Sequence, residues 1–305
     1  MEFSVLILGS NSALPAHGRH PSSQLINIHD QFYLMDCGEG TQMQLDQYDA
    51  RKSKIDSIFI SHLHGDHYFG IFGLLTTYNL MHRNQPLTIY GPEGIRKMIE
   101  TVIDGTGNAL KYKLEIVELQ ESDKPQMIHE DREANVMAFA LRHRIPTFGF
   151  LFEEKRPLRR LDGQLLDQHD VPIEVRESIR DGRDYIDPDG RRFPASYFFL
   201  EEIKPARYAY CSDTMVFDEL SDYVEGVDLL YHEATFLCSE KDRAEKTMHS
   251  TAGQAAMTAK RAGAKKLLIG HFSSRYKSLC EFQKEASAIF PTTELAEEGK
   301  TFHIE

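Results

Sequence analysis

An α/β layered fold is predicted by the way two kinds of segment alternate along this chain of 305 residues. Short runs rich in β-branched and aromatic residues alternate with segments that have helical spacing and helix-start signals. Strands that alternate with helices in this way are typical of layered α/β domains. The length suffices for one large domain with a substantial core, so we expect a single domain over residues 1–305.

Eight apolar runs are predicted to be strands. They span residues 3–9, 24–28, 31–36, 57–61, 87–91, 206–213, 227–233 and 265–271. The first is read as a strand and not as a signal peptide, because no positively charged region precedes it. Its short apolar stretch therefore belongs to the fold.

Three helices are predicted from their start signals, over residues 91–103, 250–263 and 278–291. The first has Pro92 at an expected first helical position. The second has a capping box formed by Thr251 and Gln254, and the third repeats the pattern with Ser278 and Glu281. These helices lie between some of the predicted strands or after the last of them.

The composition narrows the class of protein. Hydrophobic residues make up 41% and charged residues 27% of the chain, and no stretch approaches the roughly 18 apolar residues that span a membrane. The four cysteines are scattered without CxxC spacing, which argues against a disulfide framework and favours the reducing cytoplasm. A net charge of −12 means that nucleic-acid binding, if present, depends on local patches.

One segment, at about 153–194, interrupts the alternation of strands and helices. It is polar, turn-rich and expected to be irregular, and it carries nine Lys and Arg residues against eleven Asp and Glu. Connections of this length inside a compact domain are usually functional or disordered. We therefore expect a protruding insertion and not a separate domain.

A metal site is predicted where the strand at 57–61 ends, in the motif HLHGDH. Residues two apart in an extended segment point to the same side, so His62 and His64 can approach one ion together. Gly65 allows the chain to turn, and Asp66 and His67 then begin a helix and face a second ion. Imidazole and carboxylate ligands without thiolate suit zinc and leave Mn²⁺ and Fe as alternatives. A plain polar turn is disfavoured, because three clustered histidines repel one another when protonated.

Further ligands must come from other strand ends, and three residues are candidates. Asp213 and His271 directly follow apolar runs, and His143 lies in LRHRIPTFGF. A single His or Asp at such a place is more often structural. Three of them in a chain that also contains the HLHGDH turn favour ligation.

These motifs resemble the metallo-β-lactamase superfamily and, within it, the short form of ribonuclease Z. The resemblance runs from Leu8 to about Tyr276. HLHGDH specifies only the superfamily, whereas HEAT at 232–235 and HST at 249–251, with DCGEG at 36–40, are more specific. It implies a four-layer αβ/βα sandwich with a protruding substrate-binding arm, and a homodimer.

The resemblance also implies a set of roles. His62, His64 and His143 hold one zinc ion, while Asp66, His67 and His271 hold the other, and Asp213 bridges the two. Asp36 accepts a hydrogen bond from a ligand histidine.

The activity implied is endonucleolytic removal of the 3′ trailer from precursor tRNA, which leaves a 3′-hydroxyl on the tRNA. A hydroxide generated between two metal ions attacks the phosphodiester, with Asp66 orienting or deprotonating the water. His249, paired with Glu233, donates a proton to the leaving oxygen. A structural ion pair is the alternative for Glu233 and His249.

Five arginines are expected to contact the substrate. They are Arg19, Arg275, Arg156, Arg159 and Arg160, the last three at the start of the insertion. The loop PAHGRH departs from the family pattern, because His17 and His20 stand where Lys and Asn are usual.

Two other functions are compatible with parts of the sequence. One is a superfamily hydrolase of a small substrate such as a cyclic nucleotide, thioester or lactone, and HEAT, HST and the insertion disfavour it. The other is an RNA-binding protein with an inactive site, which the complete set of candidate ligands disfavours.

Overall fold

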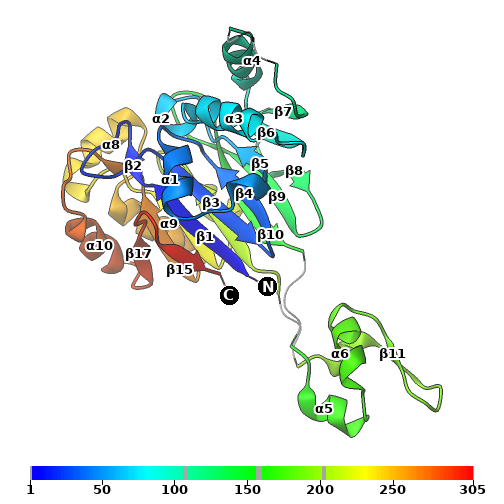
Figure 1. The fold of residues 1–305 in the computed structure, drawn as a ribbon. Helices are drawn as coiled ribbons and strands as arrows, with labels where there is room; N and C mark the ends of the chain where they lie inside the picture. Colours follow the sequence, from blue (N-terminus) through cyan, green and yellow to red (C-terminus); the bar gives the residue numbers. More distant parts are fainter. Residues whose placement is uncertain (1, 106, 108, 156–159, 201–203, 305) are drawn as a thin grey trace.

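Two seven-stranded sheets packed face to face form the body of the protein, and helices cover the outer face of each (Figure 1). The computed structural model describes residues 2–105, 107, 109–155, 160–200 and 204–304. One hydrophobic cluster lies between the sheets and two others lie between a sheet and its helices. The layers therefore run helix, sheet, sheet, helix, which confirms the predicted four-layer sandwich.

The first sheet has the strand order β18-β1-β3-β4-β5-β6-β7, in which β4 to β7 are parallel. Its strands are β1 Phe3–Gly9, β3 Ser23–Ile28, β4 Gln31–Met35, β5 Ile55–Phe59, β6 Leu87–Pro92, β7 Leu114–Leu119 and β18 Thr301–His303. The helices that connect them are α1 Thr41–Gln47, the 3-10 turn η1 Lys52–Lys54, α2 Gly65–Tyr68, α3 Ile71–Leu80 and α4 Ile95–Gly105.

The second sheet has the strand order β17-β15-β14-β13-β10-β9-β8. Its strands are β8 Gln126–Glu130, β9 Ala134–Leu141, β10 Thr147–Glu154, β13 Arg207–Cys211, β14 Leu229–Glu233, β15 Lys266–Gly270 and β17 Thr293–Leu295. Its helices are α7 Leu220–Tyr223, η3 Cys238–Glu240, α8 Lys241–Thr247, α9 Ala252–Ala262 and α10 Cys280–Ser287. A short pair, β2 Asn11–Ser12 and β16 Phe272–Ser273, links the loops of the two halves.

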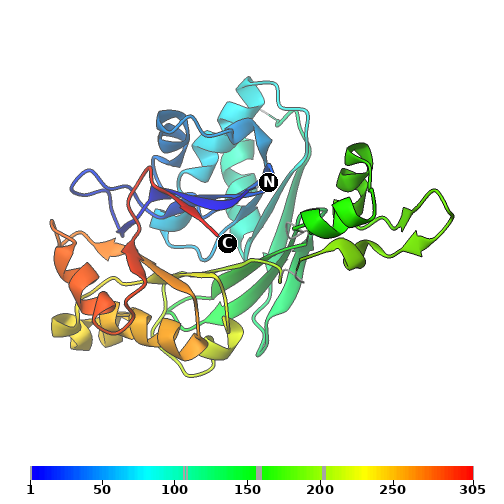
Figure 2. The same ribbon diagram turned by 90° about the horizontal axis from the view of Figure 1, so that it is seen from below.

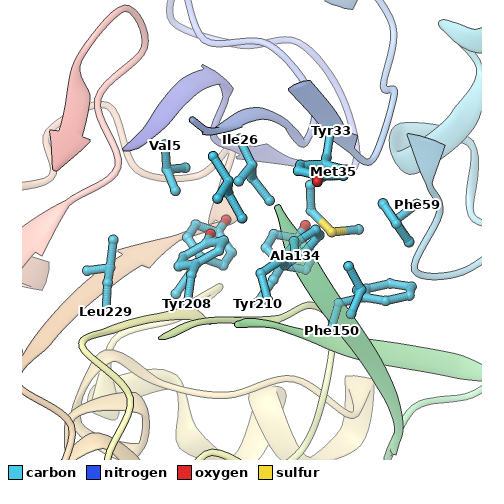
Figure 3. Packing of buried hydrophobic residues seen from close by; sticks show 14 of the residues in the cluster. Val5, Ile26, Tyr33, Met35, Phe59, Ala134, Phe150, Tyr208, Tyr210 and Leu229 are labelled. Atoms are coloured by element: carbon cyan, nitrogen blue, oxygen red, sulfur yellow. The ribbon is translucent and has the colours of Figure 1, made fainter. Parts of the chain in front are cut away.

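Aromatic and aliphatic side chains from both sheets meet in the central cluster (Figure 3). Phe59 of the first sheet stacks on Tyr90 at a centroid distance of 4.8 Å and meets Phe150 of the second sheet edge-on at 5.6 Å. Figure 2 shows the sandwich from below, with the helices of the two halves on opposite sides. Burial of this apolar surface from two sheets stabilises the sandwich and fixes the relative position of the sheet edges.

The strand directions bring the carboxyl ends of several strands together. Strands β13, β14 and β15 are parallel, and β9 runs in the same direction because both β9 and β13 pair antiparallel with β10. In the first sheet β4 and β5 also run parallel. Loops that follow parallel strands meet at one edge of a sheet, which is where such folds place their sites.

The helix signals predicted from the sequence are confirmed in one case and wrong in two. The capping box of Thr251 and Gln254 is present at the start of α9. Pro92 instead ends β6, and α4 begins at Ile95, because the Glu118 carboxylate accepts the backbone N–H of Gly94 at 2.7 Å and so supplies the cap from a neighbouring strand.

The third predicted start signal is also wrong. Helix α10 begins at Cys280 with Leu279 at its N-cap and no side-chain cap. The Glu281 carboxylate accepts a hydrogen bond from the Lys284 ammonium at 2.8 Å instead of one from the backbone at the start of the helix.

Residues 160–200 form a lobe that protrudes from the sandwich, seen at the lower right in Figure 1. Its elements are α5 Gly163–Gln168, α6 Ile173–Arg180, the hairpin β11 Tyr185–Ile186 with β12 Arg192–Phe193, and the turn η2 Ala195–Phe198. Its polar composition suggested an irregular segment, and that prediction is wrong, because the lobe contains helices and a hairpin. Leu166, Ile179 and Phe198 are buried in a cluster of its own. We call residues 160–200 the arm.

No helix in the described ranges is both long and apolar enough to cross a membrane. All four cysteines are free.

Candidate metal centre and active site

The HLHGDH turn connects β5 to α2 at the edge where the strand ends meet. His64 has extended backbone dihedral angles at the N-cap of α2, and the helix begins at Gly65, one residue before the predicted start at Asp66. The Nε2 atom of His62 lies 3.0 Å from Nδ1 of His64, so the two rings point to a common position. Nε2 of His67 lies instead 3.3 Å from Nε2 of His271. The motif thus divides its side chains between two positions.

Side chains from three other strand ends complete these two groups. His143 follows β9, Asp213 follows β13 and His271 follows β15. Nε2 of His143 lies 3.4 Å from Nδ1 of His64. One group of potential ligands is His62, His64, His143 and Asp213, and the other is Asp66, His67 and His271. The structure therefore brings all seven predicted ligands together.

The donor set fits divalent metal ions. Two imidazole nitrogens, from His62 and His143, converge on one nitrogen of His64, and three imidazole nitrogens this close together can share one cation when their lone pairs face it. Oδ1 of Asp213 is buried without a hydrogen-bond partner among the described residues. It lies 3.1 Å from His271 Nε2 and 3.4 Å from His67 Nε2. An orphaned carboxylate oxygen among imidazole nitrogens is the environment of a metal ligand.

The protonation states favour ligation in the group of His62, His64 and His143, whereas at His67 burial is outweighed by Asp213, Asp66 and Asp36, which raise its pKa well above the ordinary value. Burial, followed by the nearby charge of His67, lowers the pKa of His62 to about 4, and burial lowers the pKa of His64 and His143. These three imidazoles are therefore neutral near pH 7, the form that binds metals. Burial opposes ionisation of Asp213, but His271, His67 and His62 hold its pKa well below the usual range. It is therefore a carboxylate.

A buried network of hydrogen bonds holds the candidate ligands His62 and His67 on the side away from the other ligands. Oδ2 of Asp36 accepts a hydrogen bond from Nδ1 of His67 at 2.7 Å, as the sequence predicted. The same atom accepts the Tyr210 hydroxyl at 2.7 Å and the Ser61 hydroxyl at 2.9 Å. Ser61 also contacts Nδ1 of His62 at 3.0 Å. One carboxylate thus fixes the ring orientation of His67 directly and that of His62 through Ser61.

Glu233 and His249 form the predicted pair beside the metal-ligand groups. Nδ1 of His249 donates to Oε1 of Glu233 at 2.8 Å, and Nε2 lies 3.9 Å from Oδ2 of Asp213. Burial opposes protonation of His249, but Glu233 and Asp213 raise its pKa to about 9. Thr235 donates to Oε2 of Glu233 and lies 2.9 Å from Nδ1 of His271, which joins the pair to the ligand set. His249 also belongs to a third potential ligand group, with Asp213 and His271.

The PAHGRH loop lies against the site. The backbone N–H of Ala13 donates to Oδ2 of Asp66 at 2.7 Å. The Arg19 guanidinium donates to the Asn11 side chain at 2.9 Å and to the Tyr276 carbonyl at 2.6 Å. His17 lies 2.9 Å from the Ser274 carbonyl. These contacts hold the loop to the β16 region.

The predicted substrate arginines are not gathered at the metal-ligand groups. A pocket of about 520 Å³ opens beside His64, Asp66, Asp213 and His249, and none of the three arginines that the structure describes (Arg19, Arg160 and Arg275) lines it. Arg19 is engaged by the chain itself, while Arg275 is exposed at the surface. Arg160 is exposed at the base of the arm, and Arg156 and Arg159 lie outside the described residues.

Several contributors were missed at the sequence level. Ser61 and Ser212 join the network beneath the ligands, through a 3.0 Å hydrogen bond between their hydroxyls. Each directly precedes a ligand, in SHLHGDH and CSD, so their position was a usable signal. The Tyr210 hydroxyl and the Ala13 N–H carried no such signal, because their roles depend on how distant segments pack.

Comparison with known proteins supports the resemblance noted in the sequence. The chain is 43% identical over 296 residues to ribonuclease Z of Porphyromonas gingivalis, covering 97% of each protein. It is also 43% identical over 305 residues to ribonuclease Z of Cytophaga hutchinsonii, covering 100% of this chain and 97% of that protein.

Solved structures agree. The crystal structure of human tRNase Z, short form, matches with a TM-score of 0.74 at 29% identity, covering 99% of both chains. The metallo-β-lactamase fold protein YhfI of Bacillus subtilis matches with a TM-score of 0.72 at 19% identity, covering 99% of this chain and 100% of that one, which supports the fold alone. The family model described as anti-Pycsar protein Apyc1 matches residues 3–157. The chain therefore belongs to the ribonuclease Z family, with a metallo-β-lactamase fold, and its residues 3–157 belong also to the family described as anti-Pycsar protein Apyc1.

Proposed function

We propose that this protein is a metal-dependent endoribonuclease that removes the 3′ trailer from precursor tRNA and leaves a 3′-hydroxyl on the tRNA. The observation that carries the proposal is the Glu233–His249 pair beside two groups of metal ligands, in a chain 43% identical to a ribonuclease Z over 97% of its length. We further propose that the enzyme binds two zinc ions and works as a homodimer in the cytoplasm.

The ligand assignment proposed is the one expected from the sequence. His62, His64 and His143 hold one ion, Asp66, His67 and His271 hold the other, and Asp213 lies between them. Bound divalent ions supply Lewis-acid stabilisation of a phosphodiester and lower the pKa of water. The site needs this positive charge, because the chain has a net charge of −12 and the pocket contains Asp66 and Asp213.

The side chains of the protein supply the proton transfers. Asp66 orients the attacking water and accepts its proton, while the Ala13 N–H holds one of its oxygens at 2.7 Å. His249 donates a proton to the departing 3′-oxygen from Nε2, since Nδ1 is held by Glu233. Glu233 in turn is fixed by backbone N–H groups of Thr214, Ser250 and Thr235 at 2.9–3.1 Å. The imidazole therefore has one defined orientation.

The decisive experiment uses a precursor tRNA with a 3′ extension. We expect the purified, metal-loaded protein to make a single cut, with a 3′-hydroxyl on the tRNA and a 5′-phosphate on the trailer, as mapped on both products. Small esters, a lactone and a cyclic nucleotide serve as parallel substrates. Rapid hydrolysis of one of these, with the precursor left intact, would favour a small-molecule hydrolase of the superfamily.

In this proposal the arm binds the tRNA and takes no part in hydrolysis of the phosphodiester. It has its own buried cluster and protrudes from the sandwich, and none of its described residues lines the pocket, so its removal should leave the sandwich folded. We expect replacement of residues 160–200 by a Gly/Ser linker to raise KM for precursor tRNA and to leave hydrolysis of bis(4-nitrophenyl) phosphate nearly unchanged. Charge reversal at Arg156, Arg159 and Arg160 should produce part of this effect.

Salt dependence provides the control for the arm prediction. KM of the wild type should rise with salt, as phosphate contacts require, and the armless variant should show a smaller slope. Equal precursor KM values with and without the arm would contradict a substrate-binding arm.

A further inference from the structure

An exposed aromatic side chain lies at the mouth of the pocket and has no role in the metal centre. Phe69 follows α2 and is 56% exposed. It lines the pocket of about 520 Å³ together with His64, Asp66 and His249. A Cβ atom at Gly65 would lie 2.3 Å from the Phe69 ring, so the ring rests directly on the backbone between His64 and Asp66. Only glycine at 65 permits this placement.

The fold does not account for this exposure. The adjacent Tyr68 is buried in the cluster between the first sheet and its helices, and Phe72 packs against the same cluster. Phe69 instead turns its ring to the pocket, where most of its surface remains open to solvent. An aromatic ring is costly to leave in water, so a ligand that covers it would gain binding free energy.

A second apolar surface lines the same pocket and comes from the loop that follows β2. Leu14, which is 50% exposed, and Pro15 line the pocket. Their loop is fixed by the Ala13 N–H on Asp66 and by Arg19 on the Tyr276 carbonyl. The apolar surface is therefore presented by a loop tied to the metal-ligand residues.

The charge beside Phe69 indicates which chemical group of a ligand this side of the pocket binds. Glu39 is exposed, lines the pocket and has no ion pair or hydrogen bond of its side chain within the described part of the chain. Its segment contacts that of Phe69, since the Gly70 N–H donates to the Cys37 carbonyl at 2.8 Å. A free carboxylate repels phosphate, so the side of the pocket near Phe69 favours an uncharged group.

We propose that Phe69, with Leu14 and Pro15, stacks an unpaired nucleobase adjacent to the scissile phosphate and thereby selects single-stranded RNA at the cut. This inference rests on the proposed function. Bases stack on aromatic rings with little sequence preference, so the platform would recognise an unstacked nucleotide and not a particular base. A phosphodiester within a continuous duplex offers no such base.

The test combines a protein change with a substrate change. We expect Phe69→Ala to lower kcat/KM for 3′-extended precursor tRNA by about 5- to 150-fold, the range for one lost base–aromatic stack. Two further precursors carry an abasic ribose, one on each side of the cleaved bond. We expect the wild type to cut one of the two with a similar loss in kcat/KM. On that abasic precursor, Phe69→Ala should cause little further loss. Phe69→Trp should retain activity.

Controls separate this proposal from the proposed function. Leu80→Ala removes an apolar side chain that is 72% exposed at the end of α3 and does not line the pocket, so it should behave as the wild type. Metal content should be equal in all variants. Failure of the wild type to cut the intact precursor would overturn the proposed function. If the wild type cuts the intact precursor, but the losses caused by Phe69→Ala and by the abasic site multiply when they are combined, the stacking proposal is wrong and the proposed function stands.

Discussion

Loss of cleavage together with loss of bound metal is the expected result for His64→Ala and for Asp213→Asn. Nδ1 of His64 is the atom on which His62 and His143 converge, and Asp213 lies between the two ligand groups. In the proposed assignment each substitution removes a direct ligand. The activity should therefore fall by more than the roughly 10- to 100-fold that accompanies loss of a residue behind a ligand.

The measurement is metal content per chain, by elemental analysis after gel filtration, beside the rate of precursor cleavage. Asp213→Asn is preferred to alanine, because it keeps the shape of a buried side chain and limits unfolding. His303→Ala and Asp218→Ala are matched controls, since both side chains are mainly exposed and lie outside the ligand groups. Full activity in either ligand variant would show that the ligand assignment is wrong.

The candidate ligands could be found in the sequence, and they lie together in the structure, because the motif and the strand ends constrain each other. His62 and His64 share a side in an extended segment, and Asp213 and His271 follow apolar runs that could only be buried strands. Parallel strands then bring these ends to one edge. The pairing of Glu233 with His249 was instead implied by the family resemblance, and the structure places the two side chains 2.8 Å apart.

What the sequence did not predict depends on contacts between distant segments. Helix α4 is capped by Glu118 of β7 and not by its own residues, so the local signal at Pro92 was misleading. The arm contains two helices although its composition is polar, because Leu166, Ile179 and Phe198 are spaced widely along the chain and meet only in the folded lobe. Arg19 was expected at the substrate but donates to Asn11, a contact within its own loop that composition does not reveal.

The network beneath the site shows a related limit. Tyr210 contributes to the metal centre only through Asp36, and its hydroxyl comes from the opposite sheet. Face-to-face packing of the two sheets is therefore a condition for a correctly oriented His67. Stability of the sandwich and geometry of the metal centre are thus coupled through buried side chains, and neither one can be inferred from local patterns.

A slower chemical step with unchanged metal content is the expected result for His249→Ala. The His249 side chain lies beside Asp213 and is held by Glu233, so it can donate a proton without being needed as a ligand. Loss of a general acid costs about 10²- to 10⁴-fold in rate. Elemental analysis should find the metal content of the wild type, whereas a lower content would place His249 among the ligands, with Asp213 and His271.

The leaving group then distinguishes proton donation from other roles of His249. The 3′-oxygen of a ribose needs a proton as it departs, whereas nitrophenolate is stable as an anion near neutral pH. We therefore expect His249→Ala to slow precursor cleavage far more than hydrolysis of bis(4-nitrophenyl) phosphate, while His303→Ala affects neither. Glu233→Gln should reproduce part of the loss on the precursor, because the imidazole would lose the carboxylate that orients it and stabilises its charge. Equal losses on the two substrates would show that His249 acts in some way other than by protonating the leaving oxygen.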